Sequence, residues 1–322
     1  MNGGAVRVAV IGRGFGARVV APVFAATDGC EIVDVVSARD DAAVRALCGR
    51  ADVDLVSVHS PPFLHAEHVL AAIDAGHAVL CDKPFGRSAA DAASMLAAAE
   101  VAGVVNLLNF EFRYDRMRET LRALVLDGAI GAVEQMTWTV VSSGSRIPLR
   151  RHGWLFERAL GGGWIGAWGS HAVDTLRWML GEVAEARAEL RTSVLERPDR
   201  DGVPTPCDAE DGFTAWLHLH SGTAVLLDGT FAAPASLAPR IVLIGSDGVL
   251  ECVADARVTV RRFDGTRDDH EREAQESDPH LVPMQRWAEV VRDAVRAGSA
   301  PEGAPTFADG LACARVLDAL RA

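Results

Sequence analysis

The chain has 322 residues, and its 44 acidic and 32 basic side chains give a formal net charge of −12. This length suits two domains rather than one core, and the hydrophobic (49%) and charged (24%) fractions are typical of a folded globular protein. An acidic surface repels phosphate backbones and anionic lipids, so the composition argues against nucleic-acid binding and against binding to a membrane surface.

The six cysteines are widely spaced and form no C-x-x-C pair, so they predict no zinc site and are typical of small buried side chains in a reducing compartment. No secretory signal pattern precedes the first predicted strand, and no apolar run approaches the roughly eighteen residues of a membrane span. We therefore expect a cytoplasmic protein.

A predicted strand at 6–11 runs into a turn that contains Gly12, Gly14 and Gly16, and a helical stretch follows. The pattern G-x-G-x-x-A between a strand and a helix is typical of dinucleotide binding, because backbone N–H groups at the helix start can meet a pyrophosphate. An ordinary glycine-rich turn is the alternative. Phe15, inside the turn, is included among the predicted cofactor contacts.

The second predicted strand, 31–36, ends at the sequence SARDD. A fold that binds NAD usually carries an acid at this point, whereas an arginine suits the 2′-phosphate of NADP. Ser37 and Arg39 occupy the position and favour NADP, although Asp40 or Asp41 could serve NAD instead and Arg39 could be a surface charge.

Only one helical stretch, 41–48, separates this strand from the next, which lies in DLVSVHSPP (54–62). A complete unit would have a helix, a strand and a helix here, so we predict a Rossmann-like parallel sheet that lacks one edge strand. The three histidines that follow predict no metal site, since no acid or thiol completes a ligand set. The cofactor contacts expected in this segment are Ser60, Pro61, Pro62 and His65.

After Arg113 the pattern changes to neighbouring strands joined by short turns, which predicts a large open, mostly antiparallel sheet. Residues 197–212 are predicted as a polar loop, and two helices are predicted at 281–297 and 308–320. We place a dinucleotide-binding domain at 1–113 and a domain for substrate binding and oligomerisation at 114–322. The predicted strands are 133–141, 183–192, 213–219, 224–230, 240–244, 249–252 and 258–263.

Three motifs in order carry a resemblance: the glycine turn, CDKPFG (81–86) and GGGWIGAWGSHAVD (161–174). Together they resemble the Gfo/Idh/MocA family, the relatives of glucose-fructose oxidoreductase and inositol dehydrogenase. The resemblance implies NAD(P)-dependent oxidation or reduction of a sugar, cyclitol or related polyol, in a homodimer or homotetramer. The E-K-P motif of that family supplies a lysine beside the nicotinamide and a cis bond before the proline. Asp82, Lys83 and Pro84 fill its positions, with aspartate in place of glutamate.

The glycine-rich motif departs from the family at Ala167, where relatives carry an aspartate that shares proton transfer with the histidine. His171 and Asp174 remain and, with Lys83, are the predicted catalytic residues. Oxidising an alcohol develops negative charge on its oxygen, which an ammonium group stabilises, and an imidazole can exchange the proton. The alternatives are a structural histidine, a solvated loop lysine and glycines that serve packing. The predicted substrate contacts are Lys83, Asn109, Arg113, Trp154, Trp168 and His171.

Several alternatives stay open from the sequence. At least one tryptophan of the motif region is expected to be a packing residue. Arg113 can pair with a carboxylate across the domain joint rather than with a substrate. Two other functions also fit: a glycoside hydrolase or lyase that uses the nicotinamide transiently, and a non-catalytic dinucleotide-binding sensor, which Ala167 makes more credible.

Overall fold

The computed structural model describes residues 4–272 and 278–322. The contacts between its residues divide the chain into two structural units, one formed by Met1–Tyr114 with Ser277–Arg315 and the other by Asp115–Glu276 with Val316–Ala322. The boundary after Tyr114 lies one residue from the predicted one. Residues 277–315, however, were placed in the second domain by the sequence and belong to the first unit.

The first unit contains a parallel five-stranded sheet in the order β2-β1-β3-β4-β5. Because β2 is an edge strand and only α2 (Asp41–Cys48) lies between β2 and β3, the prediction of a Rossmann-like sheet without one edge strand is confirmed. The strands are β1 (Val6–Ile11), β2 (Cys30–Val36), β3 (Leu55–Val58), β4 (Ala78–Cys81) and β5 (Asn106–Leu108).

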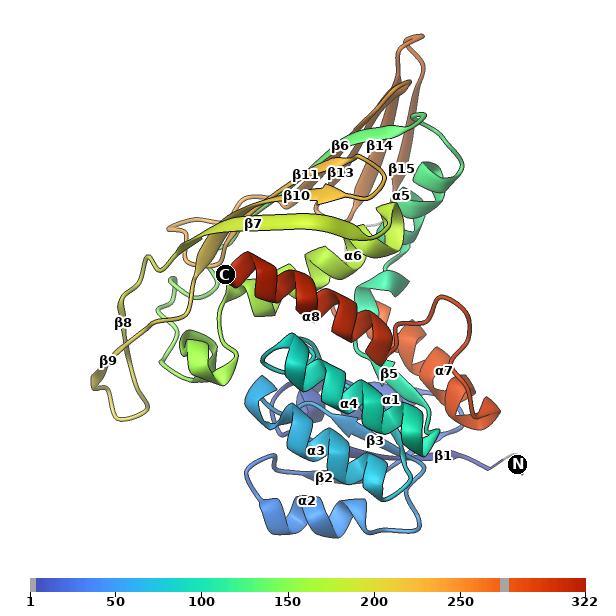
Figure 1. Ribbon diagram of the computed structural model, residues 1–322, viewed down its shortest axis with the longest axis vertical. Helices are drawn as coiled ribbons and strands as arrows, with labels where there is room; N and C mark the ends of the chain where they lie inside the picture. Colours follow the sequence, from blue (N-terminus) through green and yellow to red (C-terminus); the bar gives the residue numbers. More distant parts are fainter. Residues whose placement is uncertain (1–3, 273–277) are drawn as a thin grey trace. The chain divides into compact units, whose positions relative to one another are not determined.

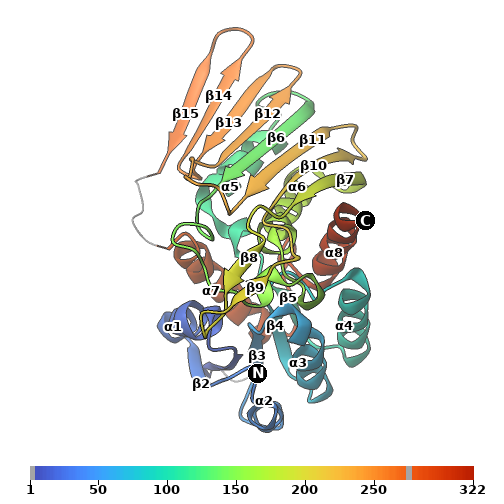
Figure 2. The same cartoon turned by 90° about the vertical axis from the view of Figure 1, so that its left-hand side faces the viewer.

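Helices cover both faces of this sheet, as a parallel sheet with apolar side chains on both sides requires. α3 (Pro62–Asp74) and α4 (Ala89–Ala102) lie on one side, and α1 (Ala21–Ala26) and α7 (Leu281–Ala297) lie on the other (Figure 2). Trp287 and Met284 of α7 are fully buried in one core with Val8 and Val10 of β1. The short α1 leaves part of this face to be covered, and α7 from the late chain covers it.

The second unit contains an eight-stranded sheet in the order β15-β14-β13-β12-β6-β11-β10-β7. All neighbours are antiparallel except β11 and β6, so the predicted large, mostly antiparallel sheet is confirmed. Figure 1 shows these strands in the green to orange part of the chain. They are β6 (Val133–Val141), β7 (Val183–Arg191), β10 (Gly212–Leu219), β11 (Ala224–Thr230), β12 (Arg240–Gly245), β13 (Gly248–Val253), β14 (Arg257–Arg262) and β15 (Arg267–Glu271).

Three strands were not predicted. β8 (Glu196–Pro198) and β9 (Pro204–Pro206) form a hairpin inside the segment expected to be a polar loop, and β15 has the charged sequence RDDHE. None of the three shows the alternation of apolar and polar residues that marks a half-buried strand, so the sequence carried no signal for them.

One face of this sheet is buried and the other is open. On β10 and β11, Ala215 and Val225 are buried, whereas Trp216 and Leu226 are 43% and 38% exposed. α5 (Arg116–Leu126) and α6 (Ser170–Leu180) lie behind the sheet in Figure 2. The remaining helical segments are η1 (Gly16–Val20), η2 (Glu111–Tyr114), η3 (Trp154–Phe156), η4 (Arg158–Leu160), η5 (Ile165–Gly169) and α8 (Phe307–Arg321).

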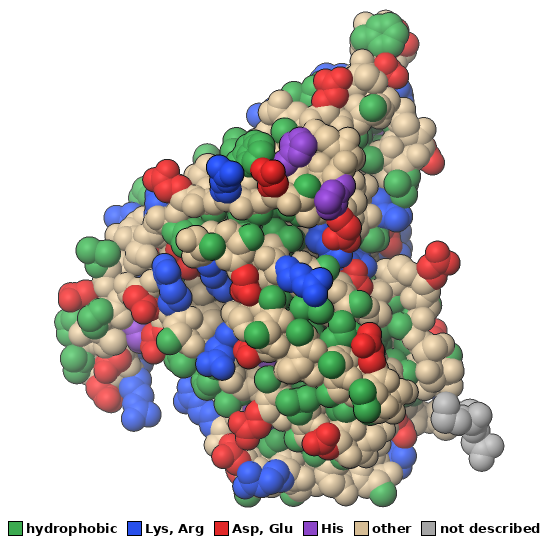
Figure 3. All heavy atoms as spheres, in the orientation of Figure 1, with side chains coloured by type: hydrophobic (Ala, Val, Ile, Leu, Met, Phe, Trp, Pro, Cys, Tyr) green, Lys and Arg blue, Asp and Glu red, His purple; other side chains and the backbone are tan. Residues whose placement is uncertain are grey.

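Acidic and basic side chains are interspersed over the face drawn in Figure 3. Among the residues that the structure describes, no helix combines the length and the apolar character needed to cross a bilayer.

Candidate functional site

The glycine turn lies at the carboxyl end of β1, and its three glycines meet different surroundings. Gly12 has a φ of +131°, and a Cβ there would lie 2.4 Å from the carbonyl oxygen of His59. A Cβ on Gly16 would lie 2.9 Å from Val10 and 3.0 Å from the Cβ of His59. Gly14 is exposed, and a Cβ there would have no neighbour within 4 Å. Packing therefore explains Gly12 and Gly16 but not Gly14. The carbonyl oxygen of Gly14 accepts hydrogen bonds from Arg18 N and Arg18 Nε, both over 3.2 Å, while the space beside its Cα is empty.

The end of β2 carries the residues that were predicted to select between NAD and NADP. Arg39 is exposed, and its backbone N–H donates to the Ser37 hydroxyl over 3.3 Å. Asp40 is already engaged, because its Oδ1 accepts a hydrogen bond from Ala43 N and so caps α2. Of the alternatives, Asp41 is an exposed residue in the first turn of α2.

The predicted contacts after β3 surround the start of α3. Pro62 is its first residue. His65 is fully buried, and its ring nitrogens lie 2.7 Å from Ser60 O and 3.1 Å from Pro84 O. The imidazole of His65 therefore links the loop after β3 to the loop after β4, and it is no surface ligand. The cofactor contacts that the sequence predicted in this segment are Ser60, Pro61, Pro62 and His65.

The Asp82-Lys83-Pro84 loop follows β4, and the Lys83–Pro84 bond is cis, as the resemblance implied. Asp82 Oδ1 accepts hydrogen bonds from Lys83 N (2.9 Å) and from Asn109 Nδ2 (3.2 Å). Its Oδ2 lies 3.3 Å from His59 Nδ1. Burial is the largest influence on the pKa of Asp82 and would raise it, but His59, Lys83 and His65 together hold that pKa below its usual range. The carboxylate of Asp82 is thus charged and fixed.

Two predicted substrate contacts have structural partners instead. Asn109 is fully buried and donates to Asp82, so it supports the loop rather than reaching an outer surface. Arg113 is 6% exposed and donates to Asp309 Oδ1 over 2.8 Å and to Gly303 O over 3.2 Å. Arg113 thus has a carboxylate partner, but Asp309 lies in the same unit and not across the joint between domains, as the alternative expected. That Arg113 contacts substrate stays a prediction.

One signal at Lys83 was missed in the sequence. Lys83 is the only lysine of the chain, and the other 31 of its 32 basic residues are arginine. A guanidinium is a planar, permanently charged fork, whereas an ammonium is a compact point charge that can also give up its proton. The one lysine in a chain that otherwise uses arginine is the signal that singles out this position.

In the second unit, the glycine-rich motif continues from η5 into α6. His171 and Asp174 lie on α6, three residues apart, and are 5% and 2% exposed. Ala167, at the position of the missing aspartate, packs against an apolar cluster that includes Phe156 and Phe231. A carboxylate at this position would therefore meet aromatic and aliphatic neighbours. The other members of that cluster are Leu155, Cys207, Trp154 and Trp164.

The first glycines of this motif are explained by packing inside the unit. A Cβ on Gly162 would lie 2.4 Å from Trp154 O. Gly163 has a φ of +104°, and a Cβ there would meet the carboxylate of Glu210, which is 1% exposed and accepts a hydrogen bond from Ile165 N (3.1 Å). The plain alternative, close packing, thus accounts for these two glycines without a ligand.

The two predicted substrate tryptophans differ. Trp168 is 9% exposed, and its ring contacts those of Trp138, Trp164 and Phe213, so its contacts favour packing. Trp154 is half-buried and lines a cavity of about 260 Å³ whose rim includes exposed arginines. The residues that line this cavity are Arg150, Arg151, His152, Gly153, Trp154, Leu155 and Phe156.

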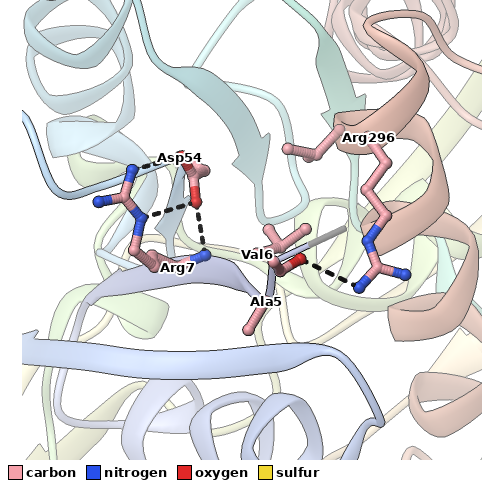
Figure 4. Close-up of a pocket in the computed structure, with 7 residues that line it drawn as sticks. Ala5, Val6, Arg7, Asp54 and Arg296 are labelled. Carbon is pink, nitrogen blue, oxygen red and sulfur yellow. Dashed lines mark hydrogen bonds and ion pairs between the residues drawn. The ribbon is translucent and has the colours of Figure 1, made fainter. Parts of the chain in front are cut away.

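Another cavity, also of about 260 Å³, lies in the first unit (Figure 4). It is lined by Ala5, Val6 and Arg7 at the start of β1, and the Arg7 guanidinium faces Asp54, with Nη2 and Oδ1 2.8 Å apart. Ligands of open parallel sheets bind at the carboxyl ends of the strands. This cavity is at the opposite end of β1 from the glycine turn and is not the candidate site.

The predicted residues thus fall into two groups. The glycine turn, the loop after β3 and the Asp82-Lys83-Pro84 loop come together in the first unit, at the carboxyl ends of β1, β3 and β4. Trp154, Trp168, His171 and Asp174 belong to the second unit. That Lys83 and His171 act on one substrate stays a prediction.

Two family models match the chain. The model described as "Oxidoreductase family, NAD-binding Rossmann fold" matches residues 40–110, and the "GFO/IDH/MocA C-terminal domain" matches residues 119–251. Together they cover more than half of the chain.

Similar proteins agree with these matches. D-apiose dehydrogenase of Paraburkholderia graminis is 28% identical over 313 residues, which are 90% of this chain and 76% of that protein. Levoglucosan dehydrogenase of Pseudarthrobacter phenanthrenivorans is 28% identical over 159 residues, which are 49% of this chain and 41% of that protein. In this alignment the chain spans less than half the length of that relative.

A solved structure of levoglucosan dehydrogenase in complex with NADH and levoglucosan matches with a TM-score of 0.86, over 98% of this chain and 96% of that chain. The two sequences are 21% identical in this superposition, so the likeness establishes the fold. With both family models in chain order on the matching fold, the chain belongs to the Gfo/Idh/MocA family of oxidoreductases and has its NAD-binding Rossmann fold.

Proposed function

We propose that this protein transfers a hydride between NAD(P) and a secondary alcohol or ketone of a sugar, cyclitol or related polyol. The observation that carries the proposal is the pairing, in one unit, of the exposed Gly14, beside whose Cα the space is empty, with the only lysine of the chain, at the carboxyl ends of β1 and β4. The names of the relatives, which include dehydrogenases of levoglucosan and D-apiose, support a sugar-like substrate.

The bound nicotinamide supplies the hydride acceptor or donor, and the protein supplies charge stabilisation and proton transfer. The ammonium of Lys83 stabilises the negative charge that develops on the reacting oxygen. His171 exchanges the proton with that oxygen, and Asp174 on the same helix orients the imidazole. Since Ala167 stands among apolar side chains, no second acid shares the proton at this position.

Between NAD and NADP, we propose NADP as the preferred cofactor. The exposed guanidinium of Arg39 can meet a 2′-phosphate, while Asp40, the first acid after β2, already caps α2. NAD is the alternative, because the exposed Asp41 is an acid that could bind the ribose hydroxyls of NAD. Replacing Arg39 by alanine is expected to weaken NADPH binding more than NADH binding, and an equal effect on both would reject the preference.

The first experiment is a thermal-shift comparison of NAD⁺, NADP⁺, NADH and NADPH, because a ligand that binds only the folded state raises Tm with its concentration. Turnover on a panel of polyols and ketoses follows. Lys83→Ala and His171→Ala are each expected to lower kcat by about 10²–10⁴ with dinucleotide binding retained. Arg87→Ala, an exposed cation four residues from Lys83, is the matched control and is expected to keep wild-type rates.

Because Ala167 replaces the aspartate of the family, one alternative function is a dinucleotide-binding protein that does not catalyse a reaction. Tight dinucleotide binding combined with no turnover on any member of the panel would favour that rival. Turnover without accumulation of reduced cofactor would instead indicate a nicotinamide-assisted hydrolase or lyase.

A further inference from the structure

His59 stands at the end of β3, which lies between β1 and β4 in the sheet. It is 6% exposed, and its position touches the glycine turn. A Cβ on Gly12 or Gly16 would lie within 2.4 Å and 3.0 Å of His59 atoms, so the turn rests directly on this residue. The ring of Phe15, inside the turn, lies 6.0 Å from the imidazole, centroid to centroid.

The imidazole of His59 is also polar on both sides. Its Nε2 lies 2.8 Å from Ser57 Oγ, and its Nδ1 lies 3.3 Å from Asp82 Oδ2. Although serine, histidine and aspartate stand in line here, Ser57 is fully buried within β3, so its hydroxyl cannot act as a nucleophile on a substrate. This row of serine, histidine and aspartate therefore does not form a nucleophilic triad, and its role must be a different one.

The carboxylate of Asp82 connects His59 to the backbone of Lys83. While Oδ2 faces His59, Oδ1 accepts the backbone N–H of Lys83 and the amide of Asn109. Two hydrogen bonds hold Oδ1, and Oδ2 lies within ion-pair distance of the His59 ring, so the carboxylate has a defined orientation and the backbone of Lys83 is fixed by it. His59 thus contacts both the turn expected to meet the cofactor phosphates and the acid that holds the lysine loop.

We propose that His59 is a positioning residue, which packs its backbone, its Cβ and one edge of its ring against the glycine turn and holds Lys83 in place through the carboxylate of Asp82. We assign it no catalytic role, because its side chain has no exposed surface and both ring nitrogens face protein groups, Ser57 Oγ and Asp82 Oδ2. That Lys83 acts on substrate rests on the proposed function, whereas the placement of Lys83 by His59 does not.

The two parts of this role can be separated by substitution. His59→Phe keeps a ring of similar size beside Gly16 but removes the polar contacts. His59→Ala removes the ring together with its polar contacts and leaves only the backbone and the Cβ next to Gly12 and Gly16. His59→Gln restores a polar head and serves as the conservative variant. His77→Phe is the matched control, since His77 is another buried histidine of the same unit, with ring nitrogens 2.7 Å and 3.1 Å from Cys48 O and Val53 O.

A direct readout uses the single lysine. Reductive methylation with ¹³C-formaldehyde labels only Lys83 and the terminal amine, so Lys83 gives one assignable NMR signal. We expect that signal to shift or broaden in His59→Phe and in Asp82→Asn, to return towards wild type in His59→Gln, and to be unchanged in His77→Phe. A wild-type signal in His59→Phe would overturn the inference, whether or not a substrate is known.

Where turnover is measurable, kinetics and binding also separate the packing role of His59 from its polar contact with Asp82. His59→Phe is expected to lower kcat about tenfold to hundredfold, the usual cost of misplacing a reacting group, with dinucleotide Kd and KM changed less than about threefold. His59→Ala is expected to weaken dinucleotide binding as well. If His59 acts through Asp82, the double variant with Asp82→Asn is no slower than the slower single variant. Additive losses would show that the two residues act separately and would reject the chain of contacts.

Tm of every variant is compared with His77→Phe, so that a loss of folding is not mistaken for a loss of positioning. Should His59→Phe fail to fold, the comparison of His59→Gln with wild type decides by the same Lys83 signal. An inactive wild-type protein would reject the proposed function and leave the test of His59 intact.

Discussion

At the scale of single residues, the neighbouring charged residues Asp82 and Lys83 have different roles. Asp82 is held by Lys83 N, Asn109 Nδ2 and the contact with His59. The ammonium of Lys83 is the group of this loop that we propose to act on substrate. The scarcity of lysine in the chain supports the same assignment.

Lys83→Arg tests whether charge alone is enough at this position. A guanidinium keeps the positive charge but has a different shape and a longer reach, so we expect kcat to fall by about 10²-fold or more. The measurement is steady-state turnover under saturating cofactor, with Arg87→Lys as the control for an exposed arginine-lysine exchange. Wild-type turnover in Lys83→Arg would mean that only the charge matters.

The depressed pKa of Asp82 predicts a pH dependence of stability. A carboxyl group whose folded pKa lies below its unfolded value of about 3.9 stabilises the fold above that pH and loses this contribution as pH falls through the folded value. The difference in free energy of unfolding between wild type and Asp82→Asn is therefore expected to shrink below about pH 4. Urea unfolding at a series of pH values measures it, and a difference that stays constant with pH contradicts the charge pairing.

At the scale of elements, the two glycine-rich segments use glycine for different reasons. In the turn after β1, Gly12 and Gly16 are packed against β3, whereas Gly14 is open. In the motif before α6, Gly162 and Gly163 are both packed, against the backbone of η3 and against Glu210. Packing therefore accounts for Gly162 and Gly163 in the second segment, whereas in the first it leaves Gly14 unexplained, the residue we propose to meet the cofactor.

Gly14→Ala is expected to leave the free energy of unfolding within about 0.5 kcal/mol of wild type, because the added methyl meets nothing in the described structure. The same methyl stands where the backbone must approach a pyrophosphate, so dinucleotide binding is expected to weaken at least tenfold. Isothermal titration and urea unfolding give the two numbers. A stable variant with unchanged binding would place the cofactor elsewhere.

Gly163→Ala has the opposite expectation. Its positive φ and the nearby carboxylate of Glu210 oppose a side chain, so we expect a loss of about 1–3 kcal/mol in the free energy of unfolding. Gly202→Ala, at a positive φ with open space around it, is the control that isolates the clash with Glu210 from the backbone strain. Equal losses in both variants would show that the contact with Glu210 costs nothing.

At the scale of the whole molecule, the open face of the large sheet is the surface proposed for a homodimer or homotetramer. Trp216 pairs with Leu226, which pairs with Thr137, which pairs with Val242, so these side chains form a row across four strands on the exposed side. A row of this kind on an uncovered face is suited to a second copy of the chain.

The double variant Trp216→Glu with Leu226→Glu is expected to convert the assembly to monomers, because each copy would bring buried charge to the interface. Sedimentation velocity measures the mass, and Val101→Glu, at a residue 90% exposed on α4, is the control. A wild-type protein that sediments as a monomer would reject this surface as the interface.

The sequence by itself determined the features that depend on neighbours in the chain. The β-branched run before Gly12, the single helix between β2 and β3, and the neighbouring strand candidates joined by short turns after Arg113 each have a local physical cause, and the corresponding elements are confirmed. The resemblance to the family, rather than any local rule, implied the cis bond after Lys83.

Only the tertiary structure decided the features that depend on residues far apart in the chain. α7 covers the sheet of the first unit although it follows the whole second sheet, because an apolar face can be buried by any amphipathic helix that reaches it. Asn109 and Arg113 were assigned to substrate until Asp82 and Asp309 were found beside them. The position of His59 between the glycine turn and Asp82 likewise has no local signal, because it arises where three strands end side by side.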